Sequence, residues 1–430
     1  MRVKLAYGRH GLWVDLPDGV PVTVIQPRQV PGFDDEAAAL LAALRAPVGS
    51  PPLSSLPGLG GTIAVVFSDL TRPMPNDRVL PVLLGELERA GVADERIVLI
   101  NALGTHRPQT GDELQRMLGS ELVRRYRILQ HNARDGASLV EVARNHAGRP
   151  VKVNRAYLDA SLRILTGFIE PHFFAGSSGG PKAVLPGIAD LDAILDNHDP
   201  EMIAHPNATW LVTEGNPLWE EMLSVAQAVG PAFVLNVTLN ARREITGVFA
   251  GDLPTAHCAG VAHMRETATC PVAEPFDIVV ASNSGYPLDL NLYQAVKGMS
   301  AAAGVVRPGG HIVVAAECRD GVPSHGEYKR LLWESRSPRD LLERVLPAAG
   351  ACQDRWEAQI QGQILRKATV HVYAGGLSDE DLRRALVVPC RSIEETVGRL
   401  CRENRRATVA ILPDGPQAVP MLQTAGRRRL

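Results

Sequence analysis

The stretch that decides the fold reads PHFFAGSSGGPKAVLPGIADLDAILDNHD and spans residues 171–199. It follows an apolar, strand-like run, Leu162–Gly167, and combines glycines with two histidines and one lysine. His172 lies ten residues before Lys182, and His198 lies sixteen after it. Because glycine has no Cβ, it permits tight turns and close approach of the backbone to a ligand. The stretch therefore predicts a functional loop at the end of a strand.

Composition and length limit the class of protein. A chain of 430 residues exceeds what one ordinary core buries, so we expect two domains. The net charge of −2 gives no electrostatic footprint for nucleic acid or an anionic membrane. The six cysteines form no CxxC pair, which favours reduced thiols over disulfides or a thiolate zinc site. With no signal-peptide pattern and no membrane-length apolar run, we expect a cytoplasmic protein without a membrane partner.

Buried strands that alternate with helices predict the fold class. Strands are expected at 62–67, 96–100 and 162–167, and each runs into a polar loop. Such alternation is typical of an α/β domain with a largely parallel sheet, whose ligands bind beyond the carboxyl ends of the strands. A second set of strands and helices begins at Phe276.

We therefore predict two α/β domains with an active-site crevice between them. Residues 1–270 form the expected N-terminal cofactor-binding catalytic domain, and residues 275–400 form a C-terminal α/β domain. Residues 401–430 are expected as a tail that packs back on the first domain, and Cys270–Glu274 as the linker.

The loops after the first two strands carry candidate site residues. Asp69 and Arg72 have two interpretations. They form a local ion pair, or Asp69 orients the planar guanidinium of Arg72 to bind a carboxylate or phosphate. Asn76 can cap the following helix. His106, between a glycine and a proline, is either structural or a general acid/base.

The lysine of the opening stretch has three interpretations. Pro181 and Ala183 stand where a nucleotide-triphosphate loop requires glycine and a hydroxyl, so that motif is excluded. The small residues before Lys182 suit a phosphate or a covalent adduct, and the alternative is a tight turn with a solvated lysine.

His198 is a possible metal ligand with acidic and amide neighbours able to orient its ring, although no ligand cluster surrounds it.

A polar group is also expected in the second domain. Tyr293 and Lys297 are four residues apart on a predicted helix and share a face, with Gln294 beside them. They form either a binding surface for a polar ligand or a solvated helix face.

Taken together, several segments resemble the nickel-dependent lactate racemase family, in matching order and spacing from Ser68 to about Gln363. The segments are SDLTRPMPND (68–77), ALGTHRPQTGDEL (102–114), GFIEPHFFAGSSGGPKAVLPGI (167–188), DNHD (196–199), NPLWEEM (216–222) and SNSGYPLDLNLYQAVKGM (282–299). The resemblance implies a nickel pincer nucleotide, pyridinium-3-thioamide-5-thiocarboxylic acid mononucleotide, attached covalently to Lys182 and supplied by cofactor-biosynthesis enzymes.

The resemblance also implies a role for each candidate residue. His198 would complete the nickel coordination, and His106 and His172 would be the paired acid/base residues. The remaining cofactor contacts would come from Asp69, Arg72, Gly179, Gly180 and Trp356. Substrate contacts would come from Arg72, Tyr293, Gln294 and Lys297.

The implied reaction is racemisation or epimerisation of a 2-hydroxy acid, lactate or a related hydroxy or sugar acid, by reversible hydride transfer. Pro181 departs from the residue expected before the lysine, which bears on the substrate more than on the fold. Two alternatives remain: a cofactor-free protein that binds a nucleotide or acidic metabolite, and a lyase that uses Lys182 as a Schiff base.

Overall fold

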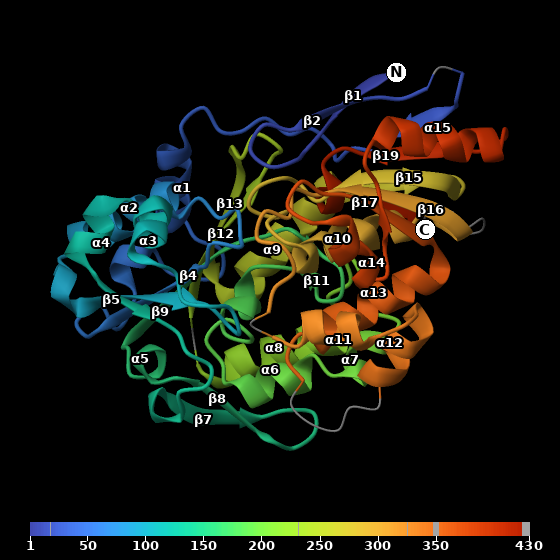
Figure 1. Cartoon of the computed structure of the whole chain (residues 1–430). Helices are drawn as coiled ribbons and strands as arrows, with labels where there is room; N and C mark the ends of the chain where they lie inside the picture. The colour runs from blue at the N-terminus through green and yellow to red at the C-terminus, as the bar shows by residue number, and fades with distance from the viewer. Residues whose placement is uncertain (18, 231, 325, 347–351, 424–430) are drawn as a thin grey trace. The chain divides into compact units, whose positions relative to one another are not determined.

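The computed structural model describes residues 1–17, 19–230, 232–324, 326–346 and 352–423 (Figure 1). The chain divides into two compact units. One, called the central unit here, comprises Gln29–Glu266, and the other, the terminal unit, combines Met1–Arg28 with Thr267–Leu430.

A six-stranded sheet forms the core of the central unit. Its strand order is β13-β12-β9-β4-β5-β6, with β13 antiparallel and the other neighbours parallel. The strands are β4 (Ile63–Ser68), β5 (Ile97–Ala102), β6 (Arg127–Gln130), β9 (Leu162–Phe168), β12 (Phe233–Leu239) and β13 (Ile245–Asp252). The middle strands are apolar along their length because both faces of a parallel sheet are covered. The predicted strands of this domain are confirmed to within about two residues.

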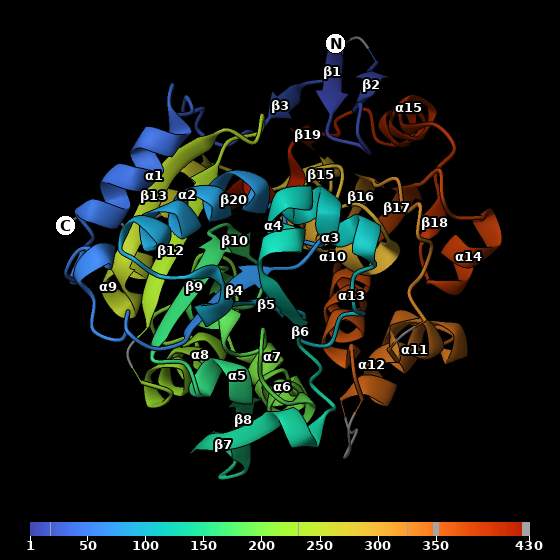
Figure 2. The same ribbon diagram turned by 90° about the vertical axis from the view of Figure 1, so that its left-hand side faces the viewer.

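Helices and short strands complete the central unit. The helices are α1 (Glu36–Arg45), α2 (Asn76–Arg89), α3 (Gly111–Leu118), α4 (Ser120–Arg125), α5 (Arg155–Leu158), α6 (Leu191–Asn197), α7 (Pro200–Ala204), α8 (Pro217–Ala228) and α9 (Leu253–Ala268). The short strands pair as β7 (Leu139–Arg144) with β8 (Pro150–Asn154), and β10 (Pro171–His172) with β11 (Gly176–Ser177). Leucines of α1 and α2 pack on one face of the sheet in a single apolar cluster, and α2–α4 lie together on that side of β4, β5 and β9 (Figure 2).

The terminal unit is built on a second six-stranded sheet, which is parallel throughout. Its order is β18-β17-β16-β15-β19-β3. The strands are β3 (Val22–Val24), β15 (Phe276–Ser282), β16 (Val306–Ala315), β17 (Thr369–Tyr373), β18 (Val388–Pro389) and β19 (Val409–Leu412). Two further pairs are β1 (Arg2–Leu5) with β2 (Leu12–Asp15), and β14 (Thr269–Val272) with β20 (Val419–Leu422).

Six helices are described in the terminal unit. They are α10 (Leu292–Ala303), α11 (Tyr328–Glu334), α12 (Pro338–Val345), α13 (Arg355–Lys367), α14 (Asp379–Arg384) and α15 (Ile393–Glu403). Helix α10 begins at Leu292 because the side chain of Asn291 accepts a hydrogen bond from the Gln294 N–H and caps it there. In the central unit, by contrast, Asn76 does not cap α2: it is the first helical residue, and its side-chain amide donates to the Ser68 carbonyl, 3.0 Å away.

The compact units differ from the predicted domains at both ends of the chain. Residues 1–28 belong to the terminal unit, where β3 pairs with β19. Residues 401–423 belong to the terminal unit, where β19 lies between β15 and β3; residues 424–430 lie outside the described part of the chain. The expected linker is largely strand, since Thr269–Val272 pairs with Val419–Leu422. These pairings join residues far apart in sequence, so no local pattern indicates them.

Within the part of the chain that the structure describes, no helix has both the length and the apolar composition needed to cross a membrane.

The position of the C-terminal segment can be tested at Gly415. Its φ is +56°, and an added Cβ would lie 2.2 Å from the backbone oxygen of Ser282. We expect Gly415→Ala to lower the free energy of unfolding by about 2 kcal/mol or more. Gly398→Ala is the control in the same unit: it lies inside α15, where an added Cβ makes only ordinary contacts, so it should stabilise by about 0.5–1 kcal/mol. Urea unfolding measures the free energy of unfolding of both variants. Equal changes in the two variants would contradict the close packing of Gly415 against Ser282.

Candidate active site

Three loops of the central unit meet at one edge of its sheet. Strands β4, β5 and β9 are parallel neighbours, so the loops that follow them leave the same edge. These loops carry Asp69, His106 and the Lys182 stretch. A hydrogen bond of 2.9 Å from the Gly104 N–H to the Gly187 carbonyl joins the second loop to the third. The second and third loops are therefore in contact at this edge of the sheet.

Asp69 orients His106. His106 Nδ1–H donates to Asp69 Oδ2 at 2.6 Å, and the Thr71 hydroxyl donates to Asp69 Oδ1 at 2.8 Å. Asp69 is buried, which alone would raise its pKa, but the interaction with His106 and the nearby charge of Arg72 outweigh burial and lower it. Asp69 is thus an anion that fixes the tautomer of His106.

Arg72 is held differently from our expectation. The Asp69 carboxylate accepts from His106 and Thr71, and Arg72 bonds to Asp69 only through its backbone N–H, 3.2 Å from the Asp69 carbonyl. Arg72 Nη1 is buried and has no hydrogen-bond partner among the described residues. A buried guanidinium N–H without an acceptor is costly, so Arg72 retains a donor for an anionic ligand.

The ring of Phe174 brings three predicted site residues together. Its centroid lies 4.4 Å from that of His172 and 5.2 Å from that of His198, both in edge-on arrangements. Lys182 Nζ lies 5.5 Å from the same centroid, within the range of a cation–π contact. Sequence reasoning missed Phe174, because nothing distinguishes it from its neighbour Phe173 before the fold is known.

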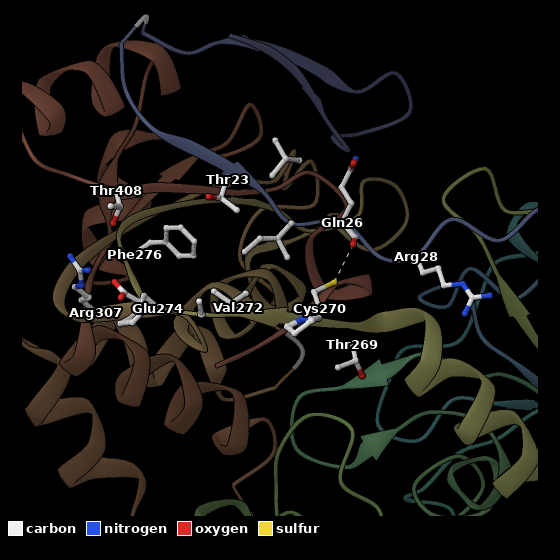
Figure 3. Close-up of a pocket in the computed structure, with 15 residues that line it drawn as sticks. Thr23, Gln26, Arg28, Thr269, Cys270, Val272, Glu274, Phe276, Arg307 and Thr408 are labelled. Atoms are coloured by element: carbon white, nitrogen blue, oxygen red, sulfur yellow. Dashed lines mark hydrogen bonds between the residues drawn. The ribbon is translucent and has the colours of Figure 1, made fainter. Parts of the chain in front are cut away.

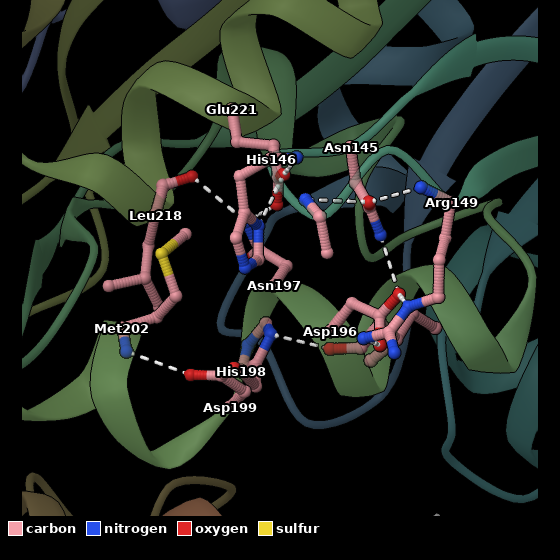
Figure 4. Close-up of polar contacts among 12 residues, drawn as sticks. Asn145, His146, Arg149, Asp196, Asn197, His198, Asp199, Met202, Leu218 and Glu221 are labelled. Carbon is pink, nitrogen blue, oxygen red and sulfur yellow. Dashed lines mark hydrogen bonds and ion pairs between the residues drawn. The ribbon is translucent and has the colours of Figure 1, made fainter.

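One ring nitrogen of His198 is bound to the backbone. It follows the last residue of α6, and its Nδ1–H donates to the Ile194 carbonyl at 3.1 Å (Figure 4). Burial, and next the positive charge of Lys182, lower the pKa of His198 to about 3. His198 is therefore neutral at pH 7, with the lone pair on Nε2, which is the form that binds a metal.

The side chains of Asp196 and Asn197, next to His198, bind other elements of the central unit. Asp196 pairs with Arg149 and accepts from the Asn145 amide, while the Asn197 amide donates to Leu218 and Glu221 (Figure 4). The expectation that Asp196 and Asn197 orient the ring is wrong, because their side chains turn to other elements. Among the described residues, no group of three or more His, Cys, Asp or Glu is placed to hold a metal ion.

His172 has the opposite tautomer to His106. It lies in β10 and is buried, and its Nδ1 accepts a hydrogen bond of 3.3 Å from the Ala175 N–H. A neutral His172 therefore carries its proton on Nε2, whereas a neutral His106, whose Nδ1–H is bound to Asp69, has its lone pair on Nε2.

The glycines before Lys182 are needed for packing. Gly179 and Gly180 have φ of +76° and +50°. An added Cβ on Gly179 would lie 2.9 Å from Asn236 Oδ1, and one on Gly180 would lie 2.4 Å from the His257 ring. Contacts with buried polar side chains thus explain both glycines without any ligand.

Pro181 also has a local role. It lies in the first turn of a 3-10 helix, Gly180–Ala183, where a fixed φ is favourable and a missing N–H costs nothing. Its carbonyl accepts from Val184 N at 3.0 Å and from Leu185 N at 3.1 Å.

Two of the three predicted second-domain residues are buried in the terminal unit. Gln294 and Lys297 lie on α10 and are only 4% and 8% exposed, so the solvated-face alternative is excluded. Trp356 of α13 donates its Nε1–H to the Tyr293 hydroxyl at 2.9 Å, which joins two residues predicted separately. Gln294 Oε1 is buried without a hydrogen-bond donor among the described residues. Sequence reasoning missed the buried charges of Arg355 and Glu357, also on α13.

A cavity of about 630 Å³ lies elsewhere in the terminal unit, along β3 and β14 (Figure 3). The Cys270 thiol borders it and donates to the Gln26 carbonyl at 3.1 Å. Burial raises the pKa of Cys270 to about 11, so the thiol is protonated and a poor nucleophile at pH 7. None of the predicted site residues lines this cavity.

The buried neutral state of His198 has a measurable consequence for stability. Its pKa is about 3 in the folded chain and near 6.5 when unfolded, so between these values the folded state binds fewer protons and stability falls as the pH falls. We expect His198→Gln to reduce the loss of unfolding free energy between pH 7 and pH 4, by up to about 3 kcal/mol. His205→Gln, at an exposed position, is the control in urea unfolding. An unchanged pH profile in His198→Gln would contradict this environment.

Comparison with known proteins places this site in a family. The model of the lactate racemase N-terminal domain matches residues 7–211, and that of the lactate racemase C-terminal domain matches residues 272–419. A lactate racemase of Thermoanaerobacterium thermosaccharolyticum is 34% identical over 423 residues, covering 97% of this chain and 98% of the relative. A lactate racemase of Lactiplantibacillus plantarum is 36% identical over 373 residues, with 86% and 87% covered.

Solved structures agree with the sequence comparison. The lactate racemase apoprotein of T. thermosaccharolyticum has a TM-score of 0.89 at 33% identity and covers 98% of this chain and 100% of its own. A Thermotoga maritima protein at 18% identity, with a TM-score of 0.65 and coverage of 90% and 97%, shares the fold. The chain belongs to the lactate racemase family.

Proposed function

We propose that this chain is an isomerase that racemises lactate or a related 2-hydroxy acid, with a nickel pincer nucleotide attached to Lys182. The observation that carries the proposal is the packing of His172, His198 and Lys182 around one phenylalanine ring. An acid/base candidate, a metal-ligand candidate and an attachment site thus lie within one cluster of side chains.

The residues present fit the proposed cofactor. His198 offers a neutral imidazole whose Nδ1–H is bound to Ile194, so that Nε2 can ligate nickel. The buried Nη1 of Arg72 and the buried hydroxyl of Ser177, both without partners among the described residues, offer hydrogen bonds to a polar group. When bound, the cofactor would accept the Cα hydride of the substrate and return it.

Hydride transfer suits this substrate because removal of the Cα hydrogen as a proton would be energetically costly. The Cα hydrogen of a 2-hydroxy carboxylate is a very poor acid, since its removal as a proton places a second negative charge beside the carboxylate. Loss of a hydride from Cα together with the hydroxyl proton gives a 2-keto acid and avoids that charge. Return of the hydride to the opposite face of the keto carbon, with a proton delivered to its oxygen, gives the other enantiomer.

The two histidines would supply the proton transfers. In the neutral tautomers given by the structure, His106 presents a base at Nε2 and His172 presents an acid at Nε2–H. One can take the hydroxyl proton as the other gives a proton back, and the roles reverse for the opposite enantiomer. Asp69 would stabilise the protonated form of His106 by its charge.

The substrate carboxylate requires cationic partners. Arg72 is proposed to contact both cofactor and substrate, with Asp69, Gly179, Gly180 and Trp356 as further cofactor contacts. Tyr293, Gln294 and Lys297 are proposed as substrate contacts, and the burial of Gln294 and Lys297 supports a ligand-binding role over a solvated face. Cofactor-biosynthesis enzymes are the partners that this proposal requires.

The covalent attachment gives the first test of the proposal. After co-expression with the cofactor-making enzymes, intact-mass and peptide analysis should show an added mass on Lys182 and one nickel per modified chain. Lys182→Arg, which keeps the charge but should not be modified, is the control. Active protein with an unmodified Lys182 would refute the mechanism, and borohydride trapping of substrate without nickel would favour a Schiff-base lyase.

The two-base scheme gives the second test. We expect His106→Ala and His172→Ala each to slow racemisation of L- and D-lactate by about 10²–10⁴-fold, because each direction needs both proton transfers. His205→Ala, an exposed histidine of the same unit, should retain activity. Loss of optical rotation measures all three, and full activity in either His106→Ala or His172→Ala would rule out the scheme.

A further inference from the structure

A buried histidine that no motif indicated lies against the loop that carries Lys182. His257 lies on α9 and is 1% exposed, and its Nε2–H donates to the Ser178 carbonyl at 3.0 Å. The ring touches the next part of this loop so closely that only glycine fits at position 180. Residues 176–184 are called the lysine loop below.

A second side chain holds the same loop from the sheet. Asn236 lies in β12 and is fully buried, and its Oδ1 accepts a hydrogen bond of 2.8 Å from the Gly180 N–H. Two side chains from separate elements thus bind backbone groups two residues apart. Lys182 N–H bonds back to the Gly179 carbonyl at 3.2 Å, so the turn that carries Lys182 starts from this held segment.

The surroundings of His257 indicate that its hydrogen bond to Ser178, rather than its packing, explains why a histidine stands here. Its Nδ1 is buried without a partner among the described residues, and one face of the ring packs on Trp219, with centroids 6.1 Å apart. Leucine would fill this space without leaving a buried nitrogen unpaired. What leucine cannot supply is the Nε2–H that binds Ser178.

We propose that His257 and Asn236 are positioning residues that fix the lysine loop and so hold Lys182 beside Phe174. Neither would contact substrate; both act through the loop backbone. The consequence for cofactor attachment rests on the function proposed above, whereas the effect on the loop itself does not. A loop fixed before attachment keeps the Lys182 amine in one place at no further entropic cost.

Hydrogen exchange of the unmodified chain tests the effect on the loop. We expect His257→Leu and Asn236→Ala each to raise amide exchange in peptides covering the lysine loop by about five- to tenfold, as expected for one lost hydrogen bond. His257→Gln, whose amide can reach Ser178, should restore most of the protection. Asn236→Ala keeps the test decisive if His257→Leu does not fold.

His131 offers a matched control. It is also buried in the central unit and donates its Nε2–H to a backbone carbonyl, that of Ala189, at 2.9 Å. His131→Leu should raise exchange near Ala189 and leave the lysine loop protected. Unchanged exchange of the lysine loop in His257→Leu and Asn236→Ala, or the same rise in His131→Leu, would overturn the proposal.

Cofactor loading tests the consequence for Lys182. After co-expression with the cofactor-making enzymes, His257→Leu should lower the modified fraction of Lys182 severalfold, and His257→Gln should restore it. In the chains that are loaded, kcat should fall while KM for lactate stays unchanged. If wild-type Lys182 is never modified, the proposed function fails while the exchange result still decides the role of His257. Wild-type loading and kcat in His257→Leu would overturn the positioning role.

Discussion

The contact that organises this candidate site is the packing of three candidate side chains around the ring of Phe174. Two imidazole rings in T-shaped contact with Phe174 and an ammonium within cation–π range leave little freedom in His172, His198 and Lys182. The low dielectric of the cluster also decides protonation: burial and the charge of Lys182 keep His198 neutral. A neutral imidazole beside a lysine fits the metal ligation and covalent attachment proposed above.

The sheet explains why these residues can meet. Parallel strands deliver their loops to one edge, and the hydrogen bond from Gly104 to Gly187 joins two of those loops. The fine geometry comes from hydrogen bonds to the backbone: the Ile194 carbonyl accepts from His198 Nδ1–H, and the Ala175 N–H donates to His172 Nδ1. Asp69 sets the tautomer of His106, so the two candidate acid/base residues begin in complementary states.

Sequence patterns predicted the parts of this molecule that depend on local chemistry. Strands β4, β5 and β9 are apolar runs with polar ends, and the loop residues after them were identified by residue type and by resemblance. The pairing of β19 with β3, which brings the first 28 residues into the terminal unit, depends on contacts distant in sequence. Asn236 gave a weak signal as an amide inside an apolar strand, whereas His257 gave none, because its helix shows only ordinary alternation of small and polar residues.

The most direct test of the central claim follows the substrate Cα hydrogen during racemisation. L-Lactate is incubated with the loaded enzyme in D2O, and the D-lactate formed is analysed by NMR and mass spectrometry. Hydride transfer within the site predicts that D-lactate retains protium at Cα while the hydroxyl exchanges freely. Deuterium at Cα in proportion to the D-lactate formed would show proton abstraction from carbon and would contradict the account.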